Sequence, residues 1–185
     1  MNHPAIWYLM RGSGVVTLIL FTAVVMPGIA TTKRWRLGRL PRFVTLGLHR
    51  NVSLLAVVFL GVHIATAIFD SYAKVNLTQL VVPLPTSGYN FYLGLGALSL
   101  DLIVAVVTTS LLRHRLTQRA WKSVHWLAYG SWPLAFVHSV GIGTDRASNW
   151  FLGTALLCLG AVGGTVVWRL LELRRPYPKY FGAAS

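Results

Sequence analysis

The sequence predicts an all-α membrane protein, folded as a bundle of five transmembrane helices. Hydrophobic residues make up 55% of the 185 residues, charged residues only 11%, and the mean hydropathy is +0.59. A soluble domain of this length does not have such a composition. The apolar residues gather in five runs, each near the length of about 20 residues that a helix needs to cross a bilayer. These runs cover residues 5–30, 46–69, 89–112, 123–142 and 150–170.

The distribution of positive charge predicts how the bundle is oriented. A net charge of +13 would suggest a nucleic-acid partner in a soluble protein, but fourteen of the seventeen lysines and arginines fall in three segments beside the apolar runs. These segments are residues 31–50, 113–122 and 169–185. Basic segments of this kind mark the cytoplasmic side of a membrane. We therefore expect a single domain over residues 1–185, with its N-terminus outside and its C-terminus in the cytoplasm, in a cell membrane, most simply a bacterial cytoplasmic one. Its expected partners include membrane lipid but no nucleic acid.

The first run has a competing interpretation as a secretory signal, because Pro27 to Ala30 resemble a cleavage site. The strongly basic segment that follows at once instead favours a retained helix. The outer connection over residues 70–89 carries Pro83 and Pro85 and is expected to be rich in turns, with room for a short interfacial segment. The third run is interrupted only by Asp101.

Two of the five runs carry a histidine at both ends. The second run has His49 and His63, and the fourth has His125 and His138. An imidazole in hydrocarbon must find partners for its nitrogens, and a metal is a partner that a neutral imidazole serves well. The two steps of fourteen and thirteen residues rise about 21 Å and about 20 Å along a helix. If both runs start in the cytoplasm, His49 is level with His125 and His63 is level with His138.

The helical phase of the two pairs differs. At about 100° per residue, His49 and His63 lie within about 40° of one another, on one face of their helix. His125 and His138 are about 140° out of phase on an ideal helix, so their helix must bend or rewind for both rings to face the same neighbour. Pro133 lies between them, and a proline inside a helix removes a backbone hydrogen bond and kinks the helix.

Two imidazoles at each level suit a six-coordinate haem iron with both axial positions filled. Such a site transfers electrons and leaves no position for a substrate. Zinc is the alternative metal, but each level supplies two ligands and no Cys, Asp or Glu at the same depth, which is short of the usual four. Histidines that are merely hydrogen-bonded between helices are the remaining alternative. The one cysteine, Cys158, lies in an apolar run without a CxxCH motif, which excludes covalently attached haem.

The pattern of His-x13-His and His-x12-His on two helices, with an intervening span and basic cytoplasmic turns, resembles the ferric reductase-like transmembrane domain. That family includes NADPH oxidases, metalloreductases and the haem-binding subunit of the methionine sulfoxide reductase system. The resemblance extends from about residue 7 to residue 171. It implies two b-type haems between the second and fourth helices, an inner iron held by His49 and His125, and an outer iron held by His63 and His138. It also implies that Arg11, in the sequence RGSG, helps to neutralise a haem propionate.

This chain departs from the large members of that family, which continue into flavin and nucleotide domains. The tail after Arg175 is short and has no Gly-rich dinucleotide motif. We therefore expect a separate electron donor, either a flavoprotein or a membrane quinol, and an extracytoplasmic acceptor that is a protein or a small molecule. The expected function is electron transfer across the membrane as a subunit of an oxidoreductase. The alternatives are a terminal reductase of ferric iron or oxygen, and a proton or ion transporter lined by histidines.

Four further residues have two interpretations each. Snorkelling to the outer surface explains Arg11 as well as a propionate does. Arg50 and Lys122 flank the inner histidines and are explained equally by the positive-inside bias. Trp132 lies midway between the two levels, where a ring would shorten an electron-tunnelling gap, but packing is the more common role of such an aromatic residue.

Overall fold

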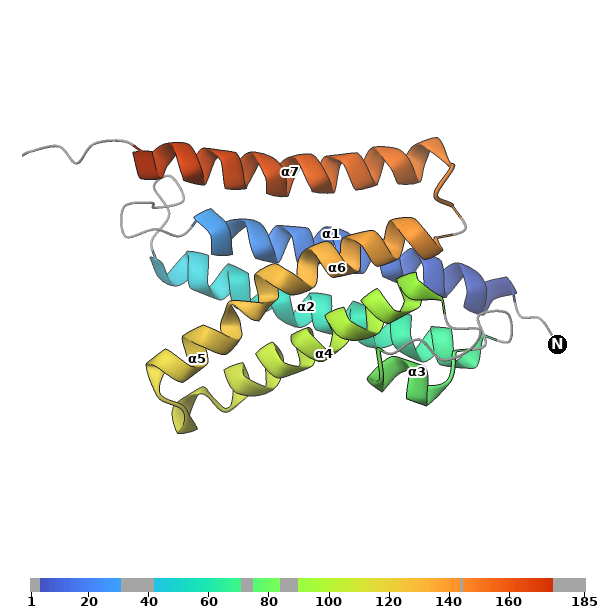
Figure 1. Cartoon of the computed structure of the whole chain (residues 1–185), viewed down its shortest axis with the longest axis horizontal. Coiled ribbons are helices and arrows are strands. Elements are labelled where there is room, and N and C mark those ends of the chain that lie inside the picture. The colour runs from blue at the N-terminus through green and yellow to red at the C-terminus, as the bar shows by residue number, and fades with distance from the viewer. Residues whose placement is uncertain (1–3, 31–41, 71–74, 84–89, 144, 175–185) are drawn as a thin grey trace, which may run out of the picture.

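The computed structural model describes residues 4–30, 42–70, 75–83, 90–143 and 145–174. Within these residues the chain is helical and contains no strand (Figure 1). The long helices are α1 (Pro4–Ala30), α2 (Arg42–Phe69), α4 (Phe91–Leu111) and α7 (Asn149–Arg174). The shorter elements are α3 (Leu77–Val81), the 3-10 turn η1 (Arg113–Arg115), α5 (Gln118–His125) and α6 (Leu127–Ile142).

The bundle has two chemically different ends. The last turns of α1 and α7, the first turns of α2, and α5 lie together at one end (Figure 1). We call this the basic end, because it carries Arg113, Lys122, Arg169 and Arg174. The start of α1, the end of α2, α3 and the end of α6 lie at the other end, which we call the far end (Figure 1).

Four of the five predicted spans are single helices. Pro4–Ile29, Phe43–Phe69, Phe91–Leu111 and Asn149–Arg174 are long and apolar enough to cross a membrane, by length and composition. The short helix α3 lies in the connection between α2 and α4, where the sequence predicts room for a short segment. The basic loop over residues 31–41 and the tail over residues 175–185, on which the predicted orientation rests, lie outside the described residues.

The predicted fourth span is not a single helix. It is divided at Trp126 into the end of α5 and the whole of α6. Helix α6 has 16 residues, which is about 24 Å and thus shorter than the roughly 30 Å of a bilayer's hydrocarbon core. Pro133 lies within the unbroken part of α6, so the break falls at Trp126, where the Tyr129 amide donates to the Trp126 carbonyl at 3.0 Å. The five-span count and its orientation stay predictions.

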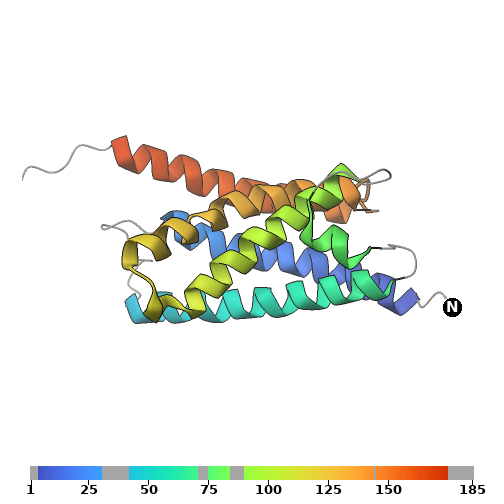
Figure 2. The same cartoon turned by 60° about the horizontal axis from the view of Figure 1, so that its bottom comes forward.

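The helices pack as two close pairs. Helix α1 runs along α2, and α4 runs along α6, while α7 and α6 also contact α1 (Figures 1 and 2). Among the described helices, α2 makes no comparable backbone contact with α4, α5 or α6. Few residues of α2 are fully buried within the chain, and much of its apolar surface is exposed. This surface is therefore left for lipid or for a group bound between the two pairs.

The hydrophobic core lies between α1, α6 and α7. It consists of buried side chains from all three helices: Leu18, Phe21, Val25, Trp132, Cys158 and Val162. The Trp132 indole Nε1 donates to Thr22 Oγ1 at 3.0 Å and its ring stacks on Phe136. Trp132 is thus a packing residue of this core, tied to α1, and Cys158 is a small buried member of it.

Glycine and serine allow α4 and α6 to approach closely. A methyl group at Gly141 of α6 would overlap the Tyr92 ring of α4. The buried Ser99 hydroxyl of α4 donates to the Ser131 carbonyl of α6 at 2.9 Å. Small residues that permit close backbone approach are typical of helix contacts in membranes.

The close approach of α4 and α6 predicts the effect of one methyl group. We expect Gly141→Ala to destabilise the protein by about 1–3 kcal/mol, because the added group forces the Tyr92 ring to move. Gly153→Ala on α7 is the matched control, since nothing lies within 4 Å of the added atom. Thermal unfolding of the detergent-solubilised variants measures both. Equal stability of the two variants would contradict this packing.

Candidate metal centre

The four histidines lie on three helices that border the space between the two helix pairs. His49 and His63 are on α2, His125 is the last residue of α5, and His138 is on α6. His49 and His125 lie toward the basic end, whereas His63 and His138 lie toward the far end. All four side chains are partly buried.

At the basic end, the imidazole of His49 on α2 lies near the imidazole of His125 on α5. The ring centroids of His49 and His125 are 6.3 Å apart, and the ring planes are inclined by 63°. Two imidazoles on opposite sides of one metal ion, with metal–nitrogen bonds of about 2.0 Å, have centroids about 6 Å apart. The separation of these rings therefore matches that of two axial ligands.

Ring stacking holds His125 in this position. The Trp121 indole stacks on the His125 imidazole with centroids 4.9 Å apart and planes 26° apart. The Arg113 guanidinium covers the same indole at 4.5 Å from its centroid. Nδ1 of His125 and Nε1 of Trp121 are buried without a hydrogen-bond partner among the described residues. The His125 ring is thus oriented by its flat contact with Trp121 and has a nitrogen that remains to be satisfied.

Toward the far end, two backbone carbonyls fix the protonation of the other histidines. Nδ1 of His63 donates to the Met10 carbonyl at 2.9 Å, and Nδ1 of His138 donates to the Tyr92 carbonyl at 2.8 Å. Because a carbonyl oxygen only accepts, both Nδ1 atoms carry a proton, and in the neutral imidazole this assignment leaves a lone pair on Nε2. Histidines that bind metals typically donate their other nitrogen to a carbonyl or carboxylate in this way.

Glycines open the path to these two carbonyls. Gly14 follows Met10 by one helical turn on α1, and Gly96 follows Tyr92 by one turn on α4. A Cβ atom at Gly14 would lie 2.9 Å from the His63 ring, and one at Gly96 would lie 2.5 Å from the His138 ring. Each imidazole therefore occupies the place of the missing side chain and reaches the carbonyl one turn earlier.

The structure places one predicted pair side by side, since the rings of His49 and His125 are 6.3 Å apart. His63 and His138 each bond to a carbonyl of another helix, and their pairing with one another stays a prediction. The backbones of α2 and of the α5–α6 segment stay apart, so the imidazoles meet between helices that are not in close contact. A flat cofactor that binds between helices needs space between the backbones, with the ligating side chains reaching into that space from both sides.

Arg11 has a partner that the sequence analysis did not identify. Its guanidinium forms an ion pair with Asp145, in the turn before α7, and lies 3.9 Å from the Trp7 ring centroid. The carboxylate that was expected from a haem propionate is thus supplied by the chain. A role of Arg11 toward a propionate stays a prediction.

Several residues of the site could not be identified from the sequence. Asp145 acts through a partner far away in the sequence, and the spacing of Met10–Gly14 and Tyr92–Gly96 becomes meaningful only when the facing histidine is known. Trp121 and His125 are four residues apart on α5, so their spacing on one helix face was a local signal for this contact. Asp101, the acid deep in the third run, forms no ion pair or hydrogen bond with any described residue.

The donor set limits which metals the centre would suit. Among the described residues, no group of three or more His, Cys, Asp or Glu side chains comes together. Each level thus offers two imidazoles and no third side-chain ligand. A metal held in a macrocycle, such as haem iron, needs only two protein ligands and fits this set of donors. A four-coordinate zinc ion needs more protein ligands than the set provides.

Comparison with known proteins assigns the chain to a family. A family model described as a domain of unknown function, DUF8596, matches residues 5–145. The chain belongs to the DUF8596 family. No curated protein and no solved structure gives a significant match to the chain. The matched DUF8596 region contains all four histidines, both glycines that face them, and the ion pair of Arg11 with Asp145.

The backbone hydrogen bonds predict the tautomers of two histidines. In the protein with 15N-labelled histidine, we expect His63 and His138 to be neutral with the proton on Nδ1, as read from imidazole nitrogen chemical shifts. Gly14→Ala should remove this signature from His63, because the added carbon displaces the ring. Gly12→Ala on the same helix should not, since nothing lies within 4 Å of the added atom. A proton on Nε2 of either residue would refute the assignment.

Proposed function

We propose that the protein is a b-type membrane cytochrome with two haems, one between His49 and His125 and one between His63 and His138. The observation that carries the proposal is the matched pair of Nδ1–H bonds from His63 and His138 to backbone carbonyls. These bonds leave both Nε2 lone pairs for a metal. The 6.3 Å separation of the His49 and His125 rings supports the same role at the second level.

In this proposal the chain supplies ligation, orientation and spacing. When bound, haem iron carries single electrons by alternating between its ferric and ferrous states. The carbonyls of Met10 and Tyr92 hold two of the rings in their ligating tautomer, and Trp121 orients a third. The step from His49 to His63 separates the two levels by about 21 Å along α2. Two levels at this spacing suit electron transfer from one membrane surface toward the other.

The fixed tautomers weigh against a proton relay through these histidines. A relay histidine accepts a proton on one nitrogen and releases it from the other, so both nitrogens need exchangeable partners. The carbonyl partners of His63 and His138 accept hydrogen bonds but cannot supply a proton. This argument favours metal ligation over the alternative of a proton or ion transporter.

The wider system is part of the same proposal. We infer five membrane crossings with the basic end in the cytoplasm of a bacterial cell, and membership of the ferric reductase-like transmembrane proteins. A separate flavoprotein or a quinol would donate electrons at the basic end. A protein or small molecule outside would accept them, which makes the chain a subunit of an oxidoreductase. Direct reduction of ferric iron or oxygen at the far end is the alternative acceptor reaction.

Histidine substitutions test both the haem count and the pairing. We expect the purified protein to bind two haems per chain, with a sharp reduced-minus-oxidised b-type band, measured by absorption and by haem extraction. His49→Ala and His125→Ala should each lose one haem, and the double variant should lose no more than one, because both ligate the same iron. His49→Ala combined with His63→Ala should lose both. Exposed His114 provides the control, since His114→Ala should keep two. Absence of a haem band would end the proposal.

Stacking on His125 makes Trp121 a positioning residue for the haem at the basic end. We expect Trp121→Leu to keep both haems but to shift the electron paramagnetic resonance g values of one of them, because these depend on the angle between the axial imidazole planes. Trp121→Phe should restore the original signal, since a ring again covers the imidazole. Trp126→Leu is the control, because the neighbouring Trp126 is 71% exposed. Identical spectra for Trp121→Leu and the unchanged protein would exclude this role.

A further inference from the structure

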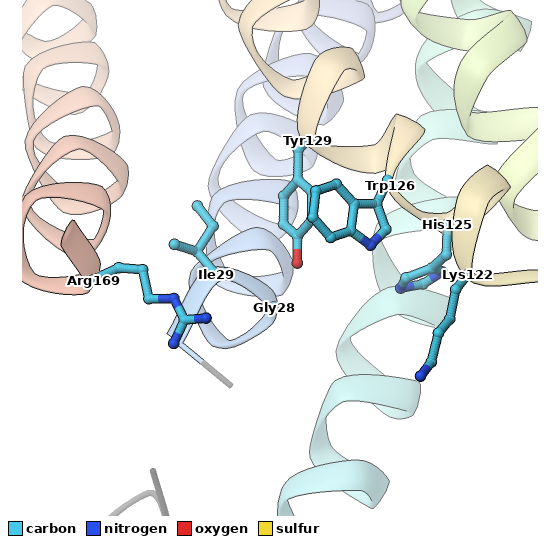
Figure 3. Close-up of a pocket in the computed structure, with 7 residues that line it drawn as sticks. All are labelled: Gly28, Ile29, Lys122, His125, Trp126, Tyr129 and Arg169. Atoms are coloured by element: carbon cyan, nitrogen blue, oxygen red, sulfur yellow. The ribbon is translucent and has the colours of Figure 1, made fainter. Parts of the chain in front are cut away.

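A cavity opens at the basic end, between the last turns of α1, the junction of α5 and α6, and α7 (Figure 3). Its volume is about 560 Å³. Gly28 and Ile29 line it from α1, Lys122 and His125 from α5, and Arg169 from α7. Only His125 is shared with the candidate metal centre. The remaining lining comes from α1, α5, α6 and α7, and no residue of α2 is among the described residues that line it.

The polar lining of this cavity is cationic. Arg169 and Lys122 approach it from opposite sides, and the Tyr129 hydroxyl points between them (Figure 3). No Asp or Glu is among the described residues that line it. Nη1 of Arg169 is buried and has no hydrogen-bond partner within the part of the chain that the structure describes. A buried guanidinium N–H without an acceptor is costly, so an anion in this cavity would satisfy a donor that the described chain leaves unpaired.

An apolar cavity continues from the cationic one toward the middle of the bundle. Its volume is about 370 Å³, and it shares Ile29 and Tyr129 with the first cavity. Its walls are side chains of α1, α6 and α7, among them Val25, Trp132 and Val166. Nε1 of Trp132 already donates to Thr22, so this part offers a ligand apolar contact only. The two cavities together have a cationic mouth and an apolar interior.

We propose that these cavities bind an anionic phospholipid. Its phosphate lies between Arg169 and Lys122 and accepts a hydrogen bond from the Tyr129 hydroxyl, and one acyl chain enters the apolar cavity between α1, α6 and α7. Basic pockets between transmembrane helices at the cytoplasmic surface characteristically hold anionic lipid head groups. A neutral quinone head would leave the two cations uncompensated, and free phosphate would leave the apolar cavity unfilled. The proposal does not depend on haem binding.

Lipid titration of the full chain in nanodiscs tests the head-group site. Phosphatidylglycerol is compared with phosphatidylcholine of the same acyl chains, by native mass spectrometry. We expect phosphatidylglycerol to bind at least tenfold more tightly. The double variant Arg169→Gln with Lys122→Gln should reduce this preference to less than twofold. Arg119→Gln with Arg174→Gln is the matched control, since it removes the same charge from exposed positions at the basic end and should keep the preference.

A second pair of variants tests the acyl-chain cavity. Val166 lines this cavity, whereas its neighbour Val167 does not and is 56% exposed. Val166→Trp should weaken binding of long-chain phosphatidylglycerol at least fivefold but leave dihexanoyl phosphatidylglycerol unaffected. Val167→Trp should change neither. Thermal unfolding verifies that each variant is folded before it is compared.

Four results would overturn the proposal. Equal binding of both phospholipids would remove the anionic preference, and competition by millimolar inorganic phosphate would identify free phosphate as the ligand. Displacement of the lipid by a short-chain quinone at equal concentration would identify a quinone site. If the double variant Arg169→Gln with Lys122→Gln lost haem but still bound lipid, the two cations would instead bind a haem propionate. None of these four results decides how many haems the protein binds, which the histidine variants measure independently.

Discussion

A neutral imidazole among apolar helices must place its single N–H on an acceptor, and this requirement shapes much of the bundle. His63 and His138 both use a backbone carbonyl of a neighbouring helix, Met10 on α1 and Tyr92 on α4. Those carbonyls are accessible because the residue one turn later is glycine in both cases. The bonds tie α2 to α1 and α6 to α4, which are the two closest helix pairs in the chain. The hydrogen bonds that hold each helix pair together therefore also point Nε2 of each histidine away from the carbonyl that its Nδ1 contacts.

The two levels of histidine are held by different forces. At the far end, hydrogen bonds to carbonyls define both the tautomer and the direction of each ring. At the basic end, His125 depends on stacking against Trp121, which is itself covered by Arg113. Stacking restrains the plane of a ring but leaves its nitrogens unbonded, and Nδ1 of His125 has no hydrogen-bond partner in the described ranges. The basic end is thus the less constrained level, and it also adjoins the cationic cavity that is lined by Lys122 and Arg169.

The fourth run changes its hydrogen-bond pattern at Trp126, between the two histidines that it carries. On a continuous helix, thirteen residues leave His125 and His138 about 140° out of phase. A bond of the 3-10 type to the Trp126 carbonyl interrupts the regular pattern between them. The interruption leaves α6 too short to span a bilayer alone. Pro133, the expected cause, lies inside α6 and leaves that helix unbroken.

The sequence by itself determined the class of the protein, because apolar runs of about 20 residues can satisfy their backbone groups in lipid only as helices. It also identified the four histidines and their matched heights, since the rise per residue of a helix is constant. The tertiary structure alone decided which acceptor each ring uses, where the fourth run breaks, and that Arg11 pairs with Asp145. These features depend on residues that meet across helices, such as Gly14 with His63 and Gly96 with His138. No local pattern encodes such contacts, because they are set by how separate helices rotate and pack against one another.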